Sequence, residues 1–274
     1  MTLELSKKDR DYIKRIFKKG RITCLTGAGI SAESGIPTFR GKGGLWEKYD
    51  PETFAYTEGL IRLFRNEPEK LVDFVADFYN VLLEAPPNAA HYCLAALEKE
   101  GVLQGLITQN IDNLHQLAGT RRICELHGNA FRLRCSGCGS KISLERERLK
   151  ELAQLLRVNR DSRIKILKTL SRYFCRCASC RSRYRIDIVL FGEELSRAEL
   201  TLAYKFVDES SSLMVIGCSL EVYPAAALPS YAKEKGLNLL EINNAPTSFS
   251  RLCDYHIIGN AAEILPKMME AVSN

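Results

Sequence analysis

The chain has 274 residues, of which 46% are hydrophobic and 26% charged, and its net charge is +6. This composition is typical of a globular protein and excludes a disordered chain, a collagen and a coiled coil. No apolar run approaches the roughly 20 residues that a membrane span requires, and residues 1–20 are charged, without an apolar signal segment. We therefore expect a soluble, cytoplasmic protein with no membrane partner.

The first strand signal is a β-prone run at residues 21–26, which ends in the glycine turn Gly27-Ala28-Gly29. A strand followed by a glycine turn is how nucleotide-binding α/β domains begin. Further strand signals alternate with helical patterns at residues 89–99 and 198–208. This alternation predicts an α/β fold with a Rossmann-like, mostly parallel sheet covered by helices. The further strand signals lie at residues 103–108, 187–191, 213–217, 238–242 and 255–258.

Two stretches depart from this alternation. Residues 41–86 are helical and aromatic-rich, and residues 131–185 carry five of the ten cysteines. We interpret both as insertions that together build a smaller, zinc-binding module, whose second part contains two short amphipathic helices between residues 149 and 170. The larger, Rossmann-like domain then comprises residues 1–40, 87–130 and 186–274.

The second insertion is strongly basic. Residues 141–185 contain 14 Lys and Arg against 4 Asp and Glu, a local charge of +10, which leaves −4 for the remainder. Such a segment is typical of a surface that binds an acidic partner or nucleic acid, and equally of a solvated helical face. The sequence leaves these alternatives open.

The ten cysteines are not expected to form a disulfide framework, because the cytosol keeps thiols reduced. Cys135-x-x-Cys138 and Cys177-x-x-Cys180 have the spacing of two zinc knuckles. The 38 residues between the pairs are more than usual, and Cys175 is a competing thiol. Four thiolates leave no open position on the metal, so we expect a structural Zn²⁺. A redox-active pair is the alternative.

The glycine turn, read as Gly27-x-Gly29-x-x-Ala32, satisfies a loose dinucleotide-binding pattern, in which backbone N–H groups approach a pyrophosphate. A Rossmann dehydrogenase would also have a second strand that ends in an acidic residue about 20 residues later. Residues 43–50 lack strand character, so Asp50 is a poor candidate for a ribose ligand. Hydride transfer is therefore not favoured.

The longer string GAGISAESGIPTFRG at residues 27–41 resembles the signature of the sirtuins, the NAD-dependent protein deacylases. Further motifs of the family follow in family order. Because six ordered motifs span residues 22–266, the chain is identified as a member of that family. The later motifs lie at residues 108–115, 125–128 (catalytic histidine), 189–193 (acyl-lysine channel), 217–226 and 242–243 (cofactor).

The resemblance implies that NAD is consumed as a co-substrate. The acyl-lysine oxygen displaces nicotinamide, and the products are nicotinamide, O-acyl-ADP-ribose and free lysine. His127 is implied to be the base that acts through the ribose hydroxyls, a role that suits a neutral imidazole. Asn110 and Asp112 are implied to be catalytic, at the ribose or an ordered water and at the nicotinamide carboxamide. Without the resemblance, both residues would be interpreted as helix caps.

Two further histidines, His91 and His256, are expected to be structural, and His115 to orient the structure. The resemblance implies a cofactor loop in which Phe39 shields the sugar and Arg40 addresses phosphate. The implied cofactor-binding residues are Gly27, Ala28, Gly29, Ser31, Glu33, Phe39, Arg40, Gln109, Asn110, Asp112, Gly217, Ser219 and Asn243.

The acyl-lysine substrate is expected to enter an apolar tunnel, and its peptide backbone to add as a strand. The family branch that removes acidic acyl groups has a Tyr and, three residues later, an Arg. Here Tyr79 is followed by Leu82, so we expect acetyl or a longer neutral acyl group. The implied substrate-binding residues are Val189, Phe191, Gly192, Glu193 and Val222.

Two other functions remain compatible with the sequence. One is a different NAD-consuming activity at the same site, either ADP-ribosyl transfer or NAD hydrolysis. The other is a non-catalytic NAD- and zinc-binding protein that binds an acidic partner through its basic insertion.

Overall fold

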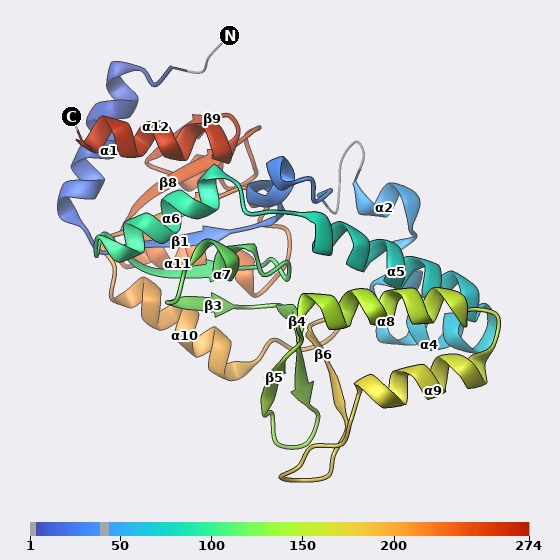
Figure 1. Ribbon diagram of the computed structural model, residues 1–274. Coiled ribbons are helices and arrows are strands. Elements are labelled where there is room, and N and C mark those ends of the chain that lie inside the picture. The colour runs from blue at the N-terminus through green and yellow to red at the C-terminus, as the bar shows by residue number, and fades with distance from the viewer. Residues whose placement is uncertain (1–3, 39–43, 274) are drawn as a thin grey trace. The chain divides into compact units, whose positions relative to one another are not determined.

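The computed structural model describes residues 4–38 and 44–273 (Figure 1). Its contacts divide the chain into two compact units. The larger unit comprises Met1–Thr38, Pro86–His127 and Leu195–Asn274, and the smaller unit comprises Phe39–Ala85 and Gly128–Glu194. Within the described part of the chain, every helix is too short or too polar to cross a membrane.

The larger unit is built on a six-stranded sheet in the order β3-β2-β1-β7-β8-β9. All neighbouring strands are parallel, and β1 is buried along its whole length, as a parallel sheet covered on both faces requires. The predicted Rossmann-like fold is therefore confirmed. The strands are β1 (Ile22–Thr26), β2 (Leu103–Thr108), β3 (Ile123–Glu125), β7 (Ser212–Ile216), β8 (Asn238–Asn243) and β9 (Tyr255–Ile258).

Helices cover both faces of this sheet, and two separate apolar clusters fill the space beneath them. One cluster joins the sheet to α1, α6 and α12. The other joins the sheet to α10 and α11. The helical patterns predicted at residues 89–99 and 198–208 are confirmed as α6 and α10. The helices are α1 (Lys7–Lys19), α6 (Ala89–Lys99), α7 (Leu114–Ala118), α10 (Arg197–Asp208), α11 (Leu228–Glu234) and α12 (Ala261–Ser273), with 3₁₀ turns η1 (Ala28–Ser34), η2 (Ala225–Ala227) and η3 (Ser250–Leu252).

The strand order reverses at β1, which has β2 on one side and β7 on the other. In open α/β sheets, ligands bind at the carboxyl ends of the strands at such a switch point. The register aligns Thr26 of β1 with Thr108 of β2 and with Ile216 of β7. The loops that follow these three strands therefore begin side by side.

The smaller unit combines a helical layer with a three-stranded antiparallel sheet in the order β5-β4-β6. The two amphipathic helices predicted in the second insertion are confirmed as α8 and α9, and α8 packs against α5. The elements are α2 (Leu45–Lys48), α3 (Pro51–Phe54), α4 (Thr57–Asn66), α5 (Pro68–Glu84), β4 (Gly128–Cys135), β5 (Lys141–Ser143), α8 (Arg146–Val158), α9 (Arg163–Tyr173) and β6 (Tyr184–Ile188).

One strand prediction is wrong. Residues 187–191 were expected to be a strand of the parallel sheet, but β6 occupies Tyr184–Ile188 and pairs antiparallel with β4 in the smaller unit. The segment alternates charged and apolar residues, which suits an antiparallel sheet with one solvated face. Its Asp187 is buried and bonds to Arg132 of β4 at 2.7 Å, which ties the two strands together.

Candidate functional site

The glycine turn after β1 lies against the turn after β7. The Gly27 N–H donates to the Ile216 carbonyl at 3.1 Å, and the Gly29 N–H donates to the Gly217 carbonyl at 2.9 Å. A Cβ on Gly29 would lie 2.7 Å from the Gly217 Cα, so a side chain there would force the two turns apart. Gly217 itself has φ +61°, a left-handed conformation that favours glycine. The glycines therefore serve the close approach of two backbone loops at the switch point.

A buried polar network closes over this turn from the loop after β2. The Asn110 amide donates to the Gly27 carbonyl at 3.0 Å and to the Ser31 hydroxyl at 3.2 Å. The Ser31 hydroxyl donates in turn to Asp112 at 2.7 Å. All three side chains are buried. The structure thus brings together three of the predicted site residues that the sequence separates by about 80 positions.

Asp112 also has the capping contact that the alternative interpretation predicted. Its second carboxylate oxygen accepts the Leu114 N–H at 2.9 Å, at the start of α7. Burial raises the pKa of Asp112, while the bonds from the Leu114 N–H and the Ser31 hydroxyl oppose that shift. One oxygen therefore fixes the helix and the other faces the glycine turn.

His127 follows β3 at the same edge of the sheet. Its Nδ1 lies 2.9 Å from the carbonyl oxygen of Gln109. Because a carbonyl only accepts hydrogen bonds, Nδ1 carries the proton, and Nε2 is the basic nitrogen. Burial lowers the pKa of His127, and the Gln109 bond opposes this shift only in part. The imidazole is therefore neutral at pH 7, as a general base requires.

The loops after β7 and β8 complete this edge. The Asn243 amide donates to the Cys218 carbonyl at 3.0 Å, and the Gln109 amide reaches the Cys218 sulfur at 3.7 Å. Cys218 is buried, which raises the pKa of its thiol. Ser219 and Glu33 are exposed. The predicted residues Phe39 and Arg40 lie outside the described residues.

A second buried layer lies beneath the network, and its connection to the site was missed by the sequence reasoning. The Thr26 hydroxyl donates to Thr108 at 2.9 Å and bonds to His115 Nε2 at 3.0 Å. The rings of His91 and His115 are 4.8 Å apart, and His91 Nε2 lies 3.5 Å from the Ser31 hydroxyl. Burial lowers the pKa of His91 to about 4. The sequence feature that could have indicated this layer is the pair Thr26 and Thr108, which end neighbouring strands.

The predicted substrate residues fall in different units. Val222 lies in the larger unit, and the other four lie in the smaller unit. Phe191 donates its N–H to the Ala55 carbonyl at 2.9 Å, and its ring lies 5.7 Å from that of Tyr56. Glu193 forms a two-point ion pair with Arg185, at 2.8 and 2.7 Å, which lowers the pKa of Glu193. The Glu193 side chain therefore fixes its own loop.

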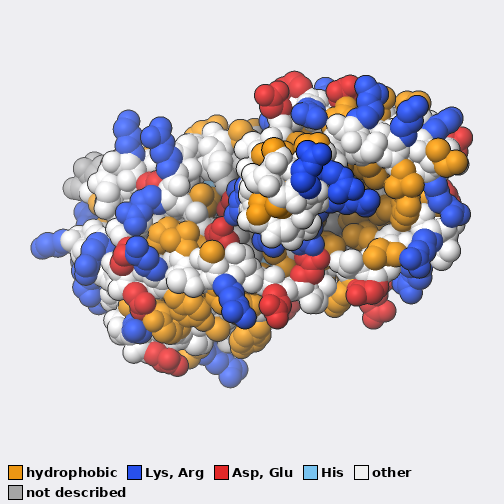
Figure 2. All heavy atoms as spheres, turned by 90° about the horizontal axis from the view of Figure 1, so that it is seen from below, with side chains coloured by type: hydrophobic (Ala, Val, Ile, Leu, Met, Phe, Trp, Pro, Cys, Tyr) orange, Lys and Arg blue, Asp and Glu red, His pale blue; other side chains and the backbone are white. Residues whose placement is uncertain are grey.

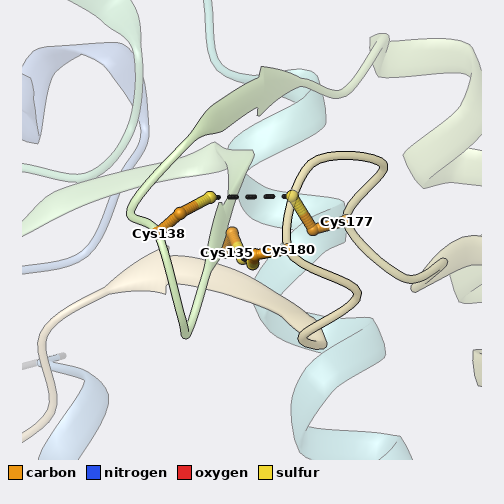
Figure 3. A group of neighbouring side chains, drawn as sticks. All are labelled: Cys135, Cys138, Cys177 and Cys180. Atoms are coloured by element: carbon orange, nitrogen blue, oxygen red, sulfur yellow. Dashed lines mark hydrogen bonds between the residues drawn. The ribbon is translucent and has the colours of Figure 1, made fainter.

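The two cysteine pairs converge in the smaller unit (Figure 3). The four sulfur atoms lie within 4.8 Å of one another, with Cys135 and Cys180 at 3.4 Å and Cys138 and Cys177 at 3.6 Å. Sulfurs in a tetrahedral Zn²⁺ site, with bonds of about 2.3 Å, are about 3.8 Å apart. The donor set and its spacing therefore fit a structural zinc ion.

The thiol that competes in the sequence, Cys175, is exposed and is not a member of this group. A hydrogen bond with Ser140, together with backbone N–H groups, lowers the pKa of Cys177 to about 5. This favours the thiolate form that a metal requires. The cluster therefore consists of the four cysteines that the knuckle spacing predicted.

Comparisons with known proteins identify the family of this chain. A model of the Sir2 family matches residues 27–224. The chain is 42% identical to an NAD-dependent protein deacylase of Pyrococcus furiosus over 94% of this chain and 96% of that protein. A crystal structure of a Sir2 homologue with NAD superimposes with a TM-score of 0.76 at 36% identity, covering 99% of this chain and 96% of that one. A Sir2 complex with a p53 peptide and NAD⁺ gives a TM-score of 0.71 at 33% identity, with coverages of 93% and 95%. The roles of individual residues stay predictions, but the chain belongs to the Sir2 family.

Proposed function

We propose that this protein is an NAD-dependent protein lysine deacylase that removes acetyl or longer neutral acyl groups. The observation that carries the proposal is the network of Asn110, Ser31 and Asp112 over the glycine turn, with the neutral imidazole of His127 held by the neighbouring Gln109 carbonyl. Relatives named as NAD-dependent protein deacylases share about 40% of the residues over most of the chain.

The switch-point edge fits a dinucleotide. Gly27 and Gly29 let the turns after β1 and β7 approach closely at this edge, and the switch point of an open parallel sheet is where such folds bind dinucleotides. NAD, when bound, supplies a ribose carbon from which nicotinamide can leave and a hydroxyl that accepts the acyl group. We assign the carboxamide of nicotinamide to Asp112 and the adenine ribose to Asn243.

His127 supplies the base in this proposal. Its Nδ1–H donates to the Gln109 carbonyl, so its Nε2 is free to accept a proton from a ribose hydroxyl. Asn110 and Asp112 are buried, which keeps water from the charged sugar that develops as nicotinamide departs. The chain therefore contributes orientation, a polar clamp and a base, without a strong nucleophile.

We propose a neutral acyl group because α5 lacks the polar pair that an acidic acyl group would need. The Tyr79 hydroxyl donates to the Ala130 carbonyl at 2.9 Å, and both Tyr79 and Leu82 are buried in the core of the smaller unit. Val189 and Phe191 are half-buried and apolar, which suits the aliphatic stem of an acylated lysine.

Three further assignments accompany this function. We propose that the larger unit is the NAD-binding domain and that the smaller unit is the zinc-binding domain. All ten cysteines are free, which is usual in a reducing compartment, so we propose a cytoplasmic location. The charge of +10 in residues 141–185 leads us to propose that this segment binds an acidic macromolecule.

The test is an assay of the purified protein with NAD and one peptide that carries lysine, acetyl-lysine, butyryl-lysine or succinyl-lysine. Mass spectrometry should detect nicotinamide, O-acyl-ADP-ribose and free lysine in equal amounts from the acetyl and butyryl peptides. Free ADP-ribose formed without any peptide would identify an NAD hydrolase instead. ADP-ribose attached to protein would identify a transferase.

A further inference from the structure

The basic excess of the smaller unit is not neutralised within that unit. Arg157 and Arg160 pair with aspartates of α5, and Arg185 pairs with Glu193. Other cations in residues 141–185 form no ion pair within the described part of the chain. These are Arg148, Lys150, Arg163, Lys165, Lys168, Arg172, Arg176, Arg181 and Arg183.

Helix α9 presents part of this charge as a row. Lys165, Lys168 and Arg172 follow the spacing i, i+3, i+7, which places them along one side of a helix over about 10 Å. All three are exposed, whereas Ile166 and Thr169 face the interior. The helix contains no acidic residue. The row therefore faces solvent with its charge uncompensated.

The row leads directly into a second group of cations on the zinc knuckle. Arg176 and Arg183 face each other across a β-bridge, where two like charges destabilise the fold. Arg181 lies in the turn between them, and all three are exposed. Figure 2, which views the molecule from below Figure 1, shows Lys and Arg side chains gathered on the lobe that projects toward the viewer. Such a pair of like charges favours the binding of an anion from solution.

The exposed apolar side chains of residues 141–185 indicate which kind of nucleic acid this surface suits. Its exposed large hydrophobic residues are aliphatic, with Ile164 at 80% and Leu167 at 54% exposure, and none is aromatic. Single-stranded nucleic acids bind by stacking bases on aromatic rings. A row of Lys and Arg without exposed aromatic rings suits a duplex instead. The phosphates of a duplex are bound through their charge and need no stacking.

We propose that the basic face formed by α9 and the second knuckle binds the phosphodiester backbone of a nucleic-acid duplex without sequence preference. This proposal narrows the acidic partner proposed above and is independent of the deacylase reaction. Each phosphate neutralised by a Lys or Arg releases counterions, so affinity falls steeply with salt. Seven of the nine cations lie on this face, from Arg163 to Arg183. They set an upper limit of about 6 on the magnitude of the slope of log affinity against log salt, at about 0.9 per phosphate contact.

The experiment measures binding of a fluorescent 20-base-pair DNA duplex to the full chain at several salt concentrations. We expect a slope between about −4 and −6. The triple variant Lys165→Gln, Lys168→Gln, Arg172→Gln should reduce the slope by about 2.7 and weaken binding at 0.1 M salt by about two orders of magnitude. Deacylation of a free peptide by the same variant should be unchanged, which shows that it is folded.

Two variants serve as matched controls. The triple variant Lys14→Gln, Lys18→Gln, Lys19→Gln removes three exposed cations from α1 and should leave the slope unchanged. An equal loss from both triple variants would overturn the proposal, because any positive charge would then suffice. Ile164→Ser with Leu167→Ser should change duplex affinity by less than about twofold, whereas a tenfold loss would indicate an apolar protein partner.

Two further probes separate the proposals. A single strand of the same length should bind more weakly than the duplex, and equal or tighter binding would overturn the duplex assignment. Binding of polyglutamate without binding of the duplex would refute nucleic acid but retain an acidic partner. Binding of neither probe would refute both proposals and leave the deacylase function untouched.

Discussion

The glycine-turn site and the four-cysteine site both gather residues that lie far apart in the sequence, but different forces hold them. At the glycine turn, Asn110, Ser31 and Asp112 are buried and hydrogen-bonded on loops that follow central strands. At the cysteine site, Cys138 and Cys180 are exposed, and the neighbouring strand β5 has only three residues, all exposed.

This difference separates two ways of fixing a site. The polar network is satisfied by the chain itself, so its geometry is set by the sheet before any ligand arrives. Only two of the four cysteines, Cys135 and Cys177, are buried, so the geometry of the site depends on the ion that it holds. Substitutions at the glycine-turn site should therefore lower the rate of the reaction, and substitutions at the four-cysteine site should destabilise the fold.

The largest expected effect comes from breaking the metal site. Cys177→Ser removes one of four thiolates and should lower the zinc content from one ion per chain to near zero. Structural zinc contributes about 10–16 kcal/mol of apparent binding energy in small zinc-dependent domains, so β4 to β6 should lose protection from hydrogen exchange. Cys175→Ser, which lies outside the cluster, should retain zinc. Full zinc content in Cys177→Ser would refute the assignment.

The second effect is on chemistry. His127→Ala removes the proposed base and should slow deacylation by about 10²–10⁴-fold, while calorimetry should show NAD affinity within a few-fold of the original. His256→Ala is the matched control, because that ring is exposed and should leave both quantities unchanged. Near-normal turnover in His127→Ala would assign the base to another residue.

Much of both sites could be predicted because their signals are local. Two-residue spacings predicted the four cysteine ligands, and the glycine turn predicted where β1 ends. The exclusion of Cys175 needed sulfur positions, because the four residues between Cys175 and Cys180 also fall within the usual spacing of zinc ligands.

Non-local features could not be predicted in the same way. The β-prone residues 187–191 indicate a strand but do not specify its partner, so β6 was assigned to the wrong sheet. The contact between His91 and His115 joins residues 24 positions apart through the packing of α6 against α7. Only the tertiary structure brings these rings to Thr26 and Ser31.

The buried histidines give the third prediction, a loss of stability at low pH. The pKa of His91 is about 4 in the folded chain, compared with 6.5 for a solvent-exposed histidine in the unfolded chain. As the pH falls, the unfolded chain therefore binds the proton first. Stability is therefore fully present above pH 6.5 and falls by about 3 kcal/mol as the pH approaches 4. His115 acts in the same direction. Urea unfolding at pH 7.5 and 5 measures this loss, which His91→Gln should reduce and His256→Gln should not.

The smallest expected effect compares two glycines of one turn. Gly29→Ala places a Cβ 2.7 Å from the Gly217 Cα and should cost about 1–3 kcal/mol of stability while weakening NAD binding at least tenfold. Gly35→Ala meets open space but has φ +85°, so it should cost about 1 kcal/mol and leave NAD affinity unchanged. Thermal unfolding and NAD titration separate the two. Equal loss of NAD affinity in both variants would mean that general flexibility of the turn, rather than its contact with the β7 loop, controls the site.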